Sequence, residues 1–286
     1  ILVFLIQAML LGGGGPIVSA VSNVKAYCWG NNKYGQVGDG TTTTPKTTPV
    51  GVDFIAFGTP SPFKKINAGG YHTCAINGND VTYCWGLNNG GQLGDNSTNN
   101  ASRPKAINQG NIPTGETLEM LSLGLYHSCA IASNAKAYCW GQGQYGQLGN
   151  SGTGGSYTPV AVSQGAIPTG IGIANMGTGS YHGCVRGSNG KLYCWGQNTY
   201  GKLGDGTTTT PRTSPVAVVD AAGANTYEIN IGNNTLTRTL TPGTTSISVS
   251  PIPAHVPGNV GISIKRLEDN VLSNSVSFTY NNLPGP

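Results

Sequence analysis

Residues 126–150 read YHSCAIASNAKAYCWGQGQYGQLGN, and the tetrapeptide Tyr-Cys-Trp-Gly within them occurs four times in the 286-residue chain. The four copies contain every Trp of the sequence, at separations of 56, 55 and 55 residues: Trp29, Trp85, Trp140 and Trp195. Each copy is followed by a glycine-flanked corner, at Gly35–Asp39, Gly91–Asp95, Gly146–Asn150 and Gly201–Asp205. Self-similarity at a fixed period of this length is the signature of a repeat protein.

Each repeat predicts about three to four short strands, the amount of chain in one blade of a β-propeller. An apolar lead-in strand comes first, then a strand that begins at Tyr-His-x-Cys, then the strand that ends in Tyr-Cys-Trp-Gly, and last a short closing strand. The expected lead-in strands are Phe63–Asn67, Leu118–Ser122 and Ile173–Met176, and the expected closing strands are Val50–Val52, Pro159–Val162 and Pro215–Val218. The four Trp are expected to fill equivalent buried positions between adjacent blades.

Six of the seven Cys fall into three pairs with a common spacing of ten residues. Turn sequences lie between the partners, so an antiparallel hairpin would set each Cys opposite its partner, at a separation that a disulfide spans. The predicted bonds are Cys74–Cys84, Cys129–Cys139 and Cys184–Cys194, with Cys28 left as a free cysteine. A metal site of His72, Cys74 and Cys84 is the alternative, but it lacks a fourth ligand and the Cys-x-x-Cys pairing of zinc modules. Disulfides are favoured, and they imply an oxidising compartment.

Residues 1–11 are almost wholly apolar, and two interpretations of them stay open. Val18-Ser19-Ala20 resembles a signal-peptidase site, which would make the segment the later part of a secretory signal. Alternatively, residues 22–28 match residues 133–139 in register, so that residues 12–28 form a degenerate first hairpin with Val18 opposite Cys28. In that case residues 1–11 are a buried strand of the array. Eleven apolar residues are too few to span a bilayer, so we expect no membrane span.

The order His-x-Cys-Ala, hairpin, Tyr-Cys-Trp-Gly and Asn-x-x-Gly-Gln-Leu-Gly-Asp resembles the repeat of the regulator of chromosome condensation family, over residues 12–220. Members of that family are seven-bladed β-propellers. The resemblance therefore implies an all-β fold with a partial or open propeller-like array of about four blades. The family's founder is a nucleotide-exchange factor for a small GTPase on chromatin, but the paired cysteines and the secretory-like start point away from that activity. The cysteines beside Trp resemble those of secreted bacterial proteins built on this repeat.

Residues 221–286 contain no Cys or Trp and alternate in the manner of strands. The expected strands are Tyr227–Ile231, Leu236–Leu240, Ser246–Val249, Val260–Ile264 and Val276–Tyr280. Residues 253–264 and 277–280 resemble the later half of an immunoglobulin-like IPT/TIG domain. That resemblance implies a small β-sandwich, a module that commonly serves as a stalk or spacer in surface proteins.

The repeated polar residues are candidates for chemistry, but each has a simpler structural role. His72, His127 and His182 recur at one position of the repeat, and we expect them to bond backbone at blade edges rather than to form a functional ring. Asp39 and Asp205, each followed by Gly and four Thr, are expected in solvated turns, because a calcium loop needs several convergent carboxylates. No Gly-x-Ser-x-Gly elbow, phosphate-binding loop or His-Glu-x-x-His motif is present, so we expect no enzyme and no cofactor.

Function is expected at the loops. The net charge is only +4 and the Lys and Arg are scattered, which argues against nucleic acid as a partner. Three sequons that permit glycosylation begin at Asn96, Asn100 and Asn233. We expect a secreted or cell-surface protein whose Thr-rich loops bind a protein or glycan partner in adhesion. The alternatives are a subunit of an extracellular filament or sheath, which self-associates through open blade edges, and a propeller-based enzyme or enzyme inhibitor.

Overall fold

The computed structural model describes residues 2–6, 25–53, 63–219, 225–231, 234–240, 258–266 and 276–280. The chain divides into two compact units, residues 1–218 and residues 219–286, each of which is considered by itself. All regular elements of both units are strands, apart from one short 3-10 turn, η2 (Thr199–Gly201), in the described part of the chain. The all-β prediction is therefore confirmed for these residues.

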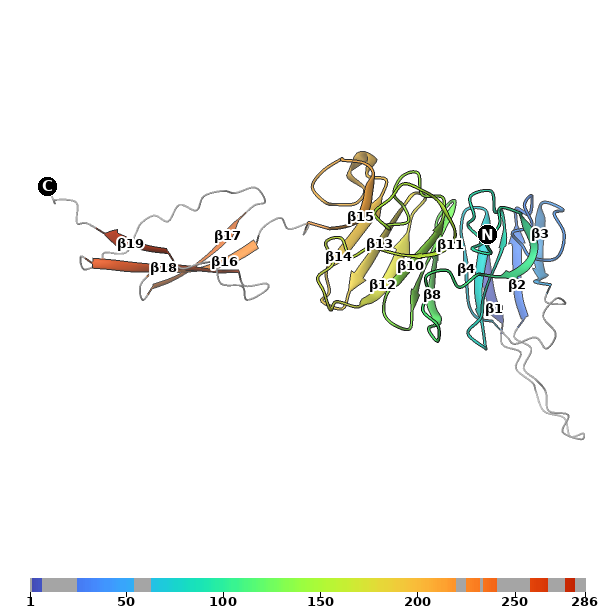
Figure 1. The fold of residues 1–286 in the computed structure, drawn as a ribbon, viewed down its shortest axis with the longest axis horizontal. Helices are drawn as coiled ribbons and strands as arrows, with labels where there is room; N and C mark the ends of the chain where they lie inside the picture. The colour runs from blue at the N-terminus through green and yellow to red at the C-terminus, as the bar shows by residue number, and fades with distance from the viewer. Residues whose placement is uncertain are drawn as a thin grey trace, which may run out of the picture. The chain divides into compact units, whose positions relative to one another are not determined.

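The first unit consists of four antiparallel sheets that follow one another in chain order, and we call them blades 1 to 4 (Figure 1). Blade 1 contains β1 (Leu2–Ile6), β2 (Lys25–Gly30) and β3 (Lys46–Gly51). Blade 2 contains β4 (Phe63–Ala68), β5 (His72–Asn77), β6 (Thr82–Gly86) and β7 (Ala101–Ala106). Blade 3 contains β8 (Leu118–Leu123), β9 (His127–Ala132), β10 (Ala137–Gly141) and β11 (Ser156–Ala161). Blade 4 contains β12 (Ile173–Thr178), β13 (His182–Gly187), β14 (Leu192–Gly196) and β15 (Arg212–Ala217).

Each blade is a meander in which neighbours in sequence are neighbours in the sheet. The first strands of successive blades lie next to one another, because β4 contacts β8 and β8 contacts β12. The predicted lead-in, Cys-containing and Trp-containing strands are confirmed. The closing strands begin earlier than predicted, since β3, β11 and β15 start at Lys46, Ser156 and Arg212.

The glycine that ends Tyr-Cys-Trp-Gly turns the chain out of the sheet. Between Cys84 and Gly86 the pairing of β6 with β7 shifts register, as in a β-bulge. Gly86 has a φ of +109°, and a Cβ there would come within 2.6 Å of the backbone oxygen of Tyr71. Only glycine fits such a position. The turn directs the chain into the corner that contacts the next blade.

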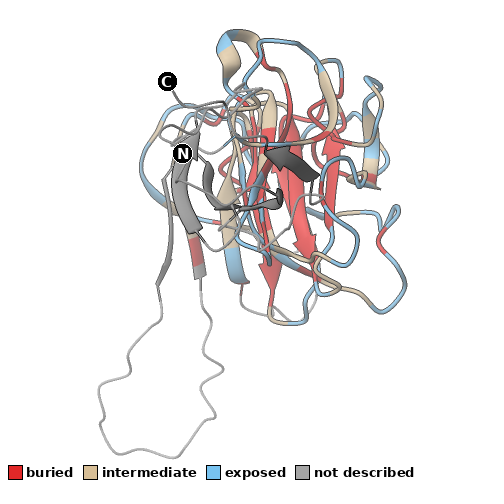
Figure 2. Cartoon of the chain, turned by 90° about the vertical axis from the view of Figure 1, so that its left-hand side faces the viewer, coloured by how far each residue is buried: buried red, intermediate tan, exposed pale blue. Residues whose placement is uncertain are grey.

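The core of the unit lies between blades, where buried residues concentrate on the strands (Figure 2). The indole nitrogen of Trp140 in blade 3 donates to the backbone oxygen of Gln92 in the corner of blade 2, at 3.0 Å. Trp195 in blade 4 donates in the same way to Gln147 in blade 3, at 2.9 Å. A buried indole N–H needs such an acceptor. The corner of one blade is thus the seat for the Trp of the next.

The prediction that all four Trp are equivalently buried is wrong for the first. Trp85, Trp140 and Trp195 have no exposed surface, whereas Trp29 is partly exposed. The three buried rings each lie against the corner glycine of the preceding blade, at Gly38, Gly94 and Gly149, and this contact is the physical reason for their burial. Burial of the repeat Trp is a property of the junction between blades and not of the repeat alone.

The predicted first hairpin is also wrong. Strand β2 pairs with β1 on one side and with β3 on the other, and Val3, not Val18, lies opposite Cys28. Residues 2–6 thus occupy the position that the Cys-containing strand takes in the other blades, in agreement with a strand in the array. Cys28 is buried and free, and burial raises the pKa of its thiol to about 12. Val18 itself lies outside the described residues.

The second unit contains one four-stranded antiparallel sheet in the order β17-β16-β18-β19. Its strands are β16 (Asn225–Ile231), β17 (Asn234–Leu240), β18 (Gly258–Arg266) and β19 (Val276–Tyr280). They confirm four of the five predicted strands, and the fifth, Ser246–Val249, falls outside the described residues. A search of the described residues finds no helix long and apolar enough to cross a membrane.

Candidate binding surface

The tyrosine of each Tyr-His-x-Cys motif lies directly before β5, β9 or β13, at the end of the blades where the corners also lie. We call this end the corner rim. Because the motif recurs in successive blades, Tyr71, Tyr126 and Tyr181 follow one another, with ring centroids 5.7 Å and 6.4 Å apart. Two corner tyrosines extend the set, with Tyr34 at 5.7 Å from Tyr71 and Tyr145 at 5.1 Å from Tyr181. These five residues form what we call the tyrosine row.

The tyrosine row is accessible to solvent, since each of its five side chains is partly exposed. The pKa of Tyr126 is raised, first by burial and then by the repulsion that its phenolate would feel from Tyr71 and Tyr181. The repulsion that acts on Tyr126 shows that its hydroxyl group lies in one region with those of Tyr71 and Tyr181. At one end, the Lys33 ammonium lies 5.5 Å from the Tyr34 ring centroid, within cation–π range. The row presents aromatic carbon together with neutral hydrogen-bonding groups.

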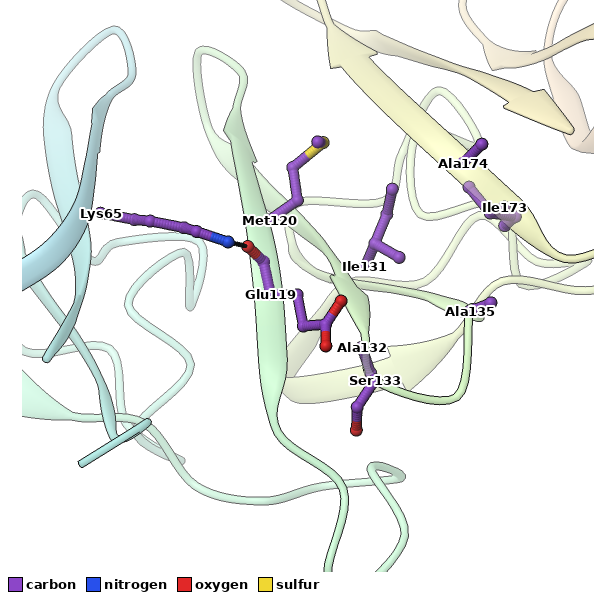
Figure 3. A pocket seen from close by; sticks show the side chains of 9 residues that line it. All are labelled: Lys65, Glu119, Met120, Ile131, Ala132, Ser133, Ala135, Ile173 and Ala174. Atoms are coloured by element: carbon purple, nitrogen blue, oxygen red, sulfur yellow. Dashed lines mark hydrogen bonds between the residues drawn. The ribbon is translucent and has the colours of Figure 1, made fainter. Parts of the chain in front are cut away.

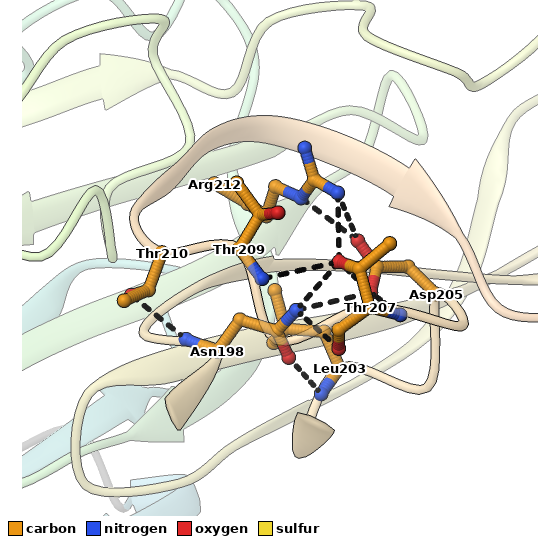
Figure 4. Close-up of polar contacts among 7 residues, drawn as sticks. All are labelled: Asn198, Leu203, Asp205, Thr207, Thr209, Thr210 and Arg212. Atoms are coloured by element: carbon orange, nitrogen blue, oxygen red, sulfur yellow. Dashed lines mark hydrogen bonds and ion pairs between the residues drawn. The ribbon is translucent and has the colours of Figure 1, made fainter. Parts of the chain in front are cut away.

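The loops that follow the corners lie on the same rim, and in blades 1, 2 and 4 a repeated set of polar contacts, which we call the polar knot, holds the loop; Figure 4 shows it for blade 4. Asn198 accepts a hydrogen bond from the backbone of Leu203 at 3.0 Å and donates to Asp205 at 3.0 Å. Its backbone N–H donates to the Thr210 hydroxyl at 3.1 Å. Arg212 lies 2.7 Å from the second Asp205 oxygen. The same contacts recur in blades 1 and 2, around Asn32 with Asp39 and around Asn88 with Asp95.

The expectation of solvated turns at Asp39 and Asp205 is wrong, because both carboxylates are hydrogen-bonded within these knots. Burial would raise the pKa of Asp39, but hydrogen bonds from Lys46 and Thr41 outweigh it and lower the pKa. Lys46 lies 2.7 Å from Asp39, so the carboxylate is already neutralised. The described residues contain no group of three or more His, Cys, Asp or Glu side chains that could hold a metal ion.

Blade 3 lacks the knot and shows what replaces it. The position of Asn88 is taken by Gly143, where a Cβ would lie 1.9 Å from the backbone oxygen of Gly154. The backbone of the loop thus fills the space that the Asn side chain fills in the other blades. Neither the knot Asn nor the tyrosine row was singled out from the sequence, although both have a visible signal: an Asn seven residues before each Asp, and a Tyr before each His.

The repeated histidines lie between blades and not at blade edges. His72 Nε2 is 2.8 Å from the hydroxyl of Ser128 in the next blade, so its partner is a side chain and not the expected backbone. Burial lowers the pKa of His72 and of His127 to about 3. The residue that corresponds to Ser128 in blade 4 is Gly183, and neither ring nitrogen of His127 has a hydrogen-bond partner in the described structure. His182 is partly exposed.

The three predicted cysteine pairs are disulfides in the structure, and each joins directly opposed residues of neighbouring strands. Five of the six cysteines are buried, and Cys184 is partly exposed. Of the sequon residues, Asn96 is exposed, and the side-chain oxygen of Asn100 accepts a hydrogen bond from the Asn88 backbone at 2.8 Å. Asn233 lies outside the described residues.

A small pocket lies at the end of the blades away from the corner rim (Figure 3). Its volume is about 170 Å³, and Met120, Ile131 and Ile173 supply much of its lining. Lys65 spans from blade 2 and donates to the backbone oxygen of Glu119. The residues that line the pocket come from three blades.

The sequence matches the Regulator of chromosome condensation (RCC1) repeat over residues 25–76, 79–131 and 189–234, and a second form of the same repeat over residues 63–92, 121–147 and 173–202. These matches cover more than half of the chain. With the repeated blade, the corner and its Trp, they establish that the chain belongs to the RCC1-repeat family.

Two curated relatives match about two thirds of this chain. The chain is 31% identical over 196 residues to the human probable E3 ubiquitin-protein ligase HERC4, which covers 68% of this chain and 18% of that protein. It is 28% identical over 202 residues to the ultraviolet-B receptor UVR8 of Arabidopsis thaliana, covering 70% of this chain and 43% of the receptor. The chain thus spans less than half the length of these relatives.

Solved structures show the same fold. Prp20p from Saccharomyces cerevisiae, a protein with binding properties towards Gsp1p and histones, superposes with a TM-score of 0.58 at 20% identity, covering 76% of this chain and 51% of that one. Human WBSCR16 gives a TM-score of 0.57 at 19% identity, covering 74% and 54%. The likeness identifies the blades as those of an RCC1-type propeller.

Proposed function

We propose that this protein is a binding scaffold whose corner rim receives a protein partner on the tyrosine row. The observation that carries the proposal is the alignment of five partly exposed tyrosines from four blades in one contiguous surface. Tyrosine offers a large and rigid contact area together with a hydroxyl, and it is enriched where binding energy concentrates in interfaces. The binding of Gsp1p and histones by Prp20p, which has the same fold, supports a protein as the partner class.

The test starts from capture of partners by the folded chain, followed by variants in the row. Tyr126→Ala removes the central ring, which has a tyrosine on each side, and should weaken binding by about tenfold or more. Tyr126→Phe keeps the ring and removes the hydroxyl, so it separates aromatic contact from hydrogen bonding. Leu192→Ala, an exposed apolar residue away from the corner rim, is the control. Binding that is unchanged in Tyr126→Ala would refute the proposal.

A glycan is the second candidate for the corner rim, because hydroxyl-bearing loops adjoin the row. In this case the knot loops contribute polar groups such as Thr207 and Thr209, and the phenol rings provide the surface for sugar carbon. A glycan array discriminates the two partner classes. Binding to defined oligosaccharides that is lost in both Tyr126→Ala and Tyr126→Phe would favour the glycan.

We further propose that the protein works outside the cell, in adhesion or at the cell surface. Three disulfides support this location, because such bonds persist in oxidising compartments. The immunoglobulin-like IPT/TIG module proposed for residues 221–286 would then act as a spacer. When the protein is denatured without reduction and then alkylated, one free thiol, Cys28, should be found. Four or more free thiols in protein from its natural source would contradict the location.

A further inference from the structure

The five hydroxyl groups of the tyrosine row have no hydrogen-bond partner among the described residues. Two other tyrosines of the same blades show the contrast. The hydroxyl groups of Tyr138 and Tyr193 accept hydrogen bonds from the side chains of Asn134 and Asn189, at 3.1 Å and 3.0 Å. A phenolic hydroxyl both donates and accepts. The row therefore offers a line of hydrogen-bonding groups that the fold itself does not use.

The backbone beneath the row, by contrast, is already hydrogen-bonded. The backbone oxygen of each tyrosine that precedes β5, β9 or β13 accepts from a backbone N–H of its own blade at 2.9 Å: Tyr71 from Leu87, Tyr126 from Gln142, and Tyr181 from Gln197. A partner that is added as a β-strand needs free backbone groups at a sheet edge. A partner on the row must instead be held by the tyrosine side chains.

The rings of the row are evenly spaced. The centroid of Tyr126 lies 5.7 Å from that of Tyr71 and 6.4 Å from that of Tyr181, and the ring planes are inclined by 30° and 31°. A polyproline II helix advances about 3.1 Å per residue, so two of its residues span about 6.2 Å. One step along the row thus matches two residues of such a helix. The three steps from Tyr34 to Tyr181 accommodate about six residues.

The chemistry of a polyproline II helix also complements the row. This helix has no internal hydrogen bonds, so its carbonyl groups are free acceptors, and proline contributes no N–H donor. The tyrosine hydroxyls can donate to these carbonyls while the phenol rings pack on the pyrrolidine rings. An amphipathic α-helix would instead press an apolar stripe onto the row and leave the hydroxyls unpaired, which costs free energy. The row therefore favours a proline-rich segment over an α-helix.

Charge adds a further requirement at one end of the row. The carboxylates of the three polar knots are all neutralised by ion pairs, in Asp39 with Lys46, Asp95 with Lys105 and Asp205 with Arg212. Lys33, which is exposed beside Tyr34, forms no ion pair with a described carboxylate. A partner segment with an acidic residue at this end would neutralise the Lys33 ammonium.

We propose that the tyrosine row binds a proline-rich segment in the polyproline II conformation, with an acidic residue of that segment beside Lys33. This inference rests on the proposed function, because it assigns a partner chemistry to the same surface. Proline has a fixed φ, so little conformational freedom is lost when the segment is ordered on the row.

Binding of a synthetic peptide to the full 286-residue chain tests the proposal. The probe is a fluorescent run of about eight prolines, slightly longer than the row, with an aspartate at each end. Its anisotropy should show saturable binding below about 1 mM. Tyr126→Ala should raise the Kd by about tenfold or more. Tyr126→Phe, which keeps the ring and the packing, should raise it by about threefold to tenfold through the loss of one hydrogen bond.

A charge reversal tests the acidic end. Lys33→Glu should raise the Kd of the aspartate peptide by about fivefold, and it should not weaken a peptide with lysine in place of the aspartates. Lys136→Glu is the matched control, because Lys136 is an exposed lysine in the turn between β9 and β10, at the other end of the blades. This variant should leave both Kd values unchanged.

The proposal is overturned if the proline peptide shows no saturable binding below about 1 mM. It is also overturned if a flexible Gly-Ser peptide with the same aspartates binds as tightly, or if Lys33→Glu and Lys136→Glu behave alike. A captured protein partner that is still lost in Tyr126→Ala would then preserve the proposed function and exclude only the proline-rich class. If neither the peptide nor the captured partner responds to Tyr126→Ala, both proposals fail.

Discussion

Blades 3 and 4 have the same strand order and the same paired cysteines, but their corners differ. In blade 3 the corner Gln147 is fully buried and its backbone oxygen accepts from Trp195. In blade 4 the corresponding Lys202 is exposed. The comparison teaches that a repeat determines its own sheet, whereas its neighbour determines which of its residues belong to the core.

The largest expected effect is on the Trp at an internal junction. Trp140→Ala removes a fully buried ring and leaves the Gln92 oxygen without its donor, so it should lower the free energy of unfolding by about 3–5 kcal/mol. Trp29→Ala should cost clearly less, because Trp29 is partly exposed. Urea unfolding followed by circular dichroism measures both. Equal losses would contradict the distinction between a Trp that a neighbouring corner buries and one that is partly exposed.

Alanine substitutions at two corner glycines compare a corner that lies against a Trp with one that does not, without removing any atoms. Gly94 and Gly204 have φ values of +71° and +66°, so alanine strains the backbone similarly at both, by about 1–2 kcal/mol. At Gly94 the new Cβ would also lie 2.7 Å from the Trp140 indole nitrogen, which adds about 1–3 kcal/mol. At Gly204 it meets only Val218, at 3.0 Å. Gly94→Ala should therefore lower the urea midpoint more than Gly204→Ala does in dilute, monomeric protein.

The sequence predicted those features that depend on neighbours within one repeat. Hairpin pairing of Cys129 with Cys139 follows from a short separation and a turn between them, so it could be predicted without any knowledge of other blades. The strands of blades 2, 3 and 4 were predictable for the same reason. A local spacing and a local alternation specify them.

The features that the sequence did not predict depend on contacts between distant segments. Strand β1 pairs with β2 across the intervening residues 7–24, a separation too long for a tight hairpin turn to specify the register. The partner of His72 is Ser128, 56 residues away, and it could be inferred only from the geometry of blade stacking. The tyrosine row has the same origin, since each ring comes from a different repeat or corner. Periodicity showed that these residues are equivalent, but not that they are adjacent.

The buried histidines His72 and His127 should make the free energy of unfolding depend on pH. Their folded pKa of about 3 lies below the ordinary value of 6.5, because burial disfavours the charged ring. Unfolding therefore takes up protons. The stability that the neutral rings contribute is complete above pH 6.5 and decreases as the pH drops towards 3. The slope reaches about 1.4 kcal/mol per pH unit for each histidine.

Substitution of single histidines shows which of them causes this pH dependence. His127→Leu should flatten the pH dependence between pH 7 and 5, by up to one proton, and His182→Leu should change it less because His182 is partly exposed. Urea unfolding at a series of pH values gives the slopes. If His127→Leu leaves the slope unchanged, the ring is already protonated in the fold, and the dry junction described here is wrong.

The smallest expected effect concerns the polar knots, which separate blade 2 from blade 3. Asp95 in blade 2 accepts from Asn88 and Ser97 and pairs with Lys105, whereas blade 3 has Asn150 at that position. Asp95→Asn should lower the free energy of unfolding by about 1 kcal/mol, since Lys105 is half-exposed and solvent weakens the ion pair.

Burial would raise the pKa of Asp95, but the hydrogen bonds from Lys105, Ser97 and Asn88 lower it. The Asp95 contribution is thus complete above about pH 4 and is lost only below it. The loss of stability in Asp95→Asn should be equal at pH 7 and pH 5, unlike that of the histidine variants. The control Asn150→Asp should give no gain in stability, because Ser156 and Val160 provide no cation at the corresponding strand positions. A loss in Asp95→Asn that does not shrink below pH 4 would mean that the carboxylate has the same pKa in the folded and unfolded states and that the knot is open to solvent.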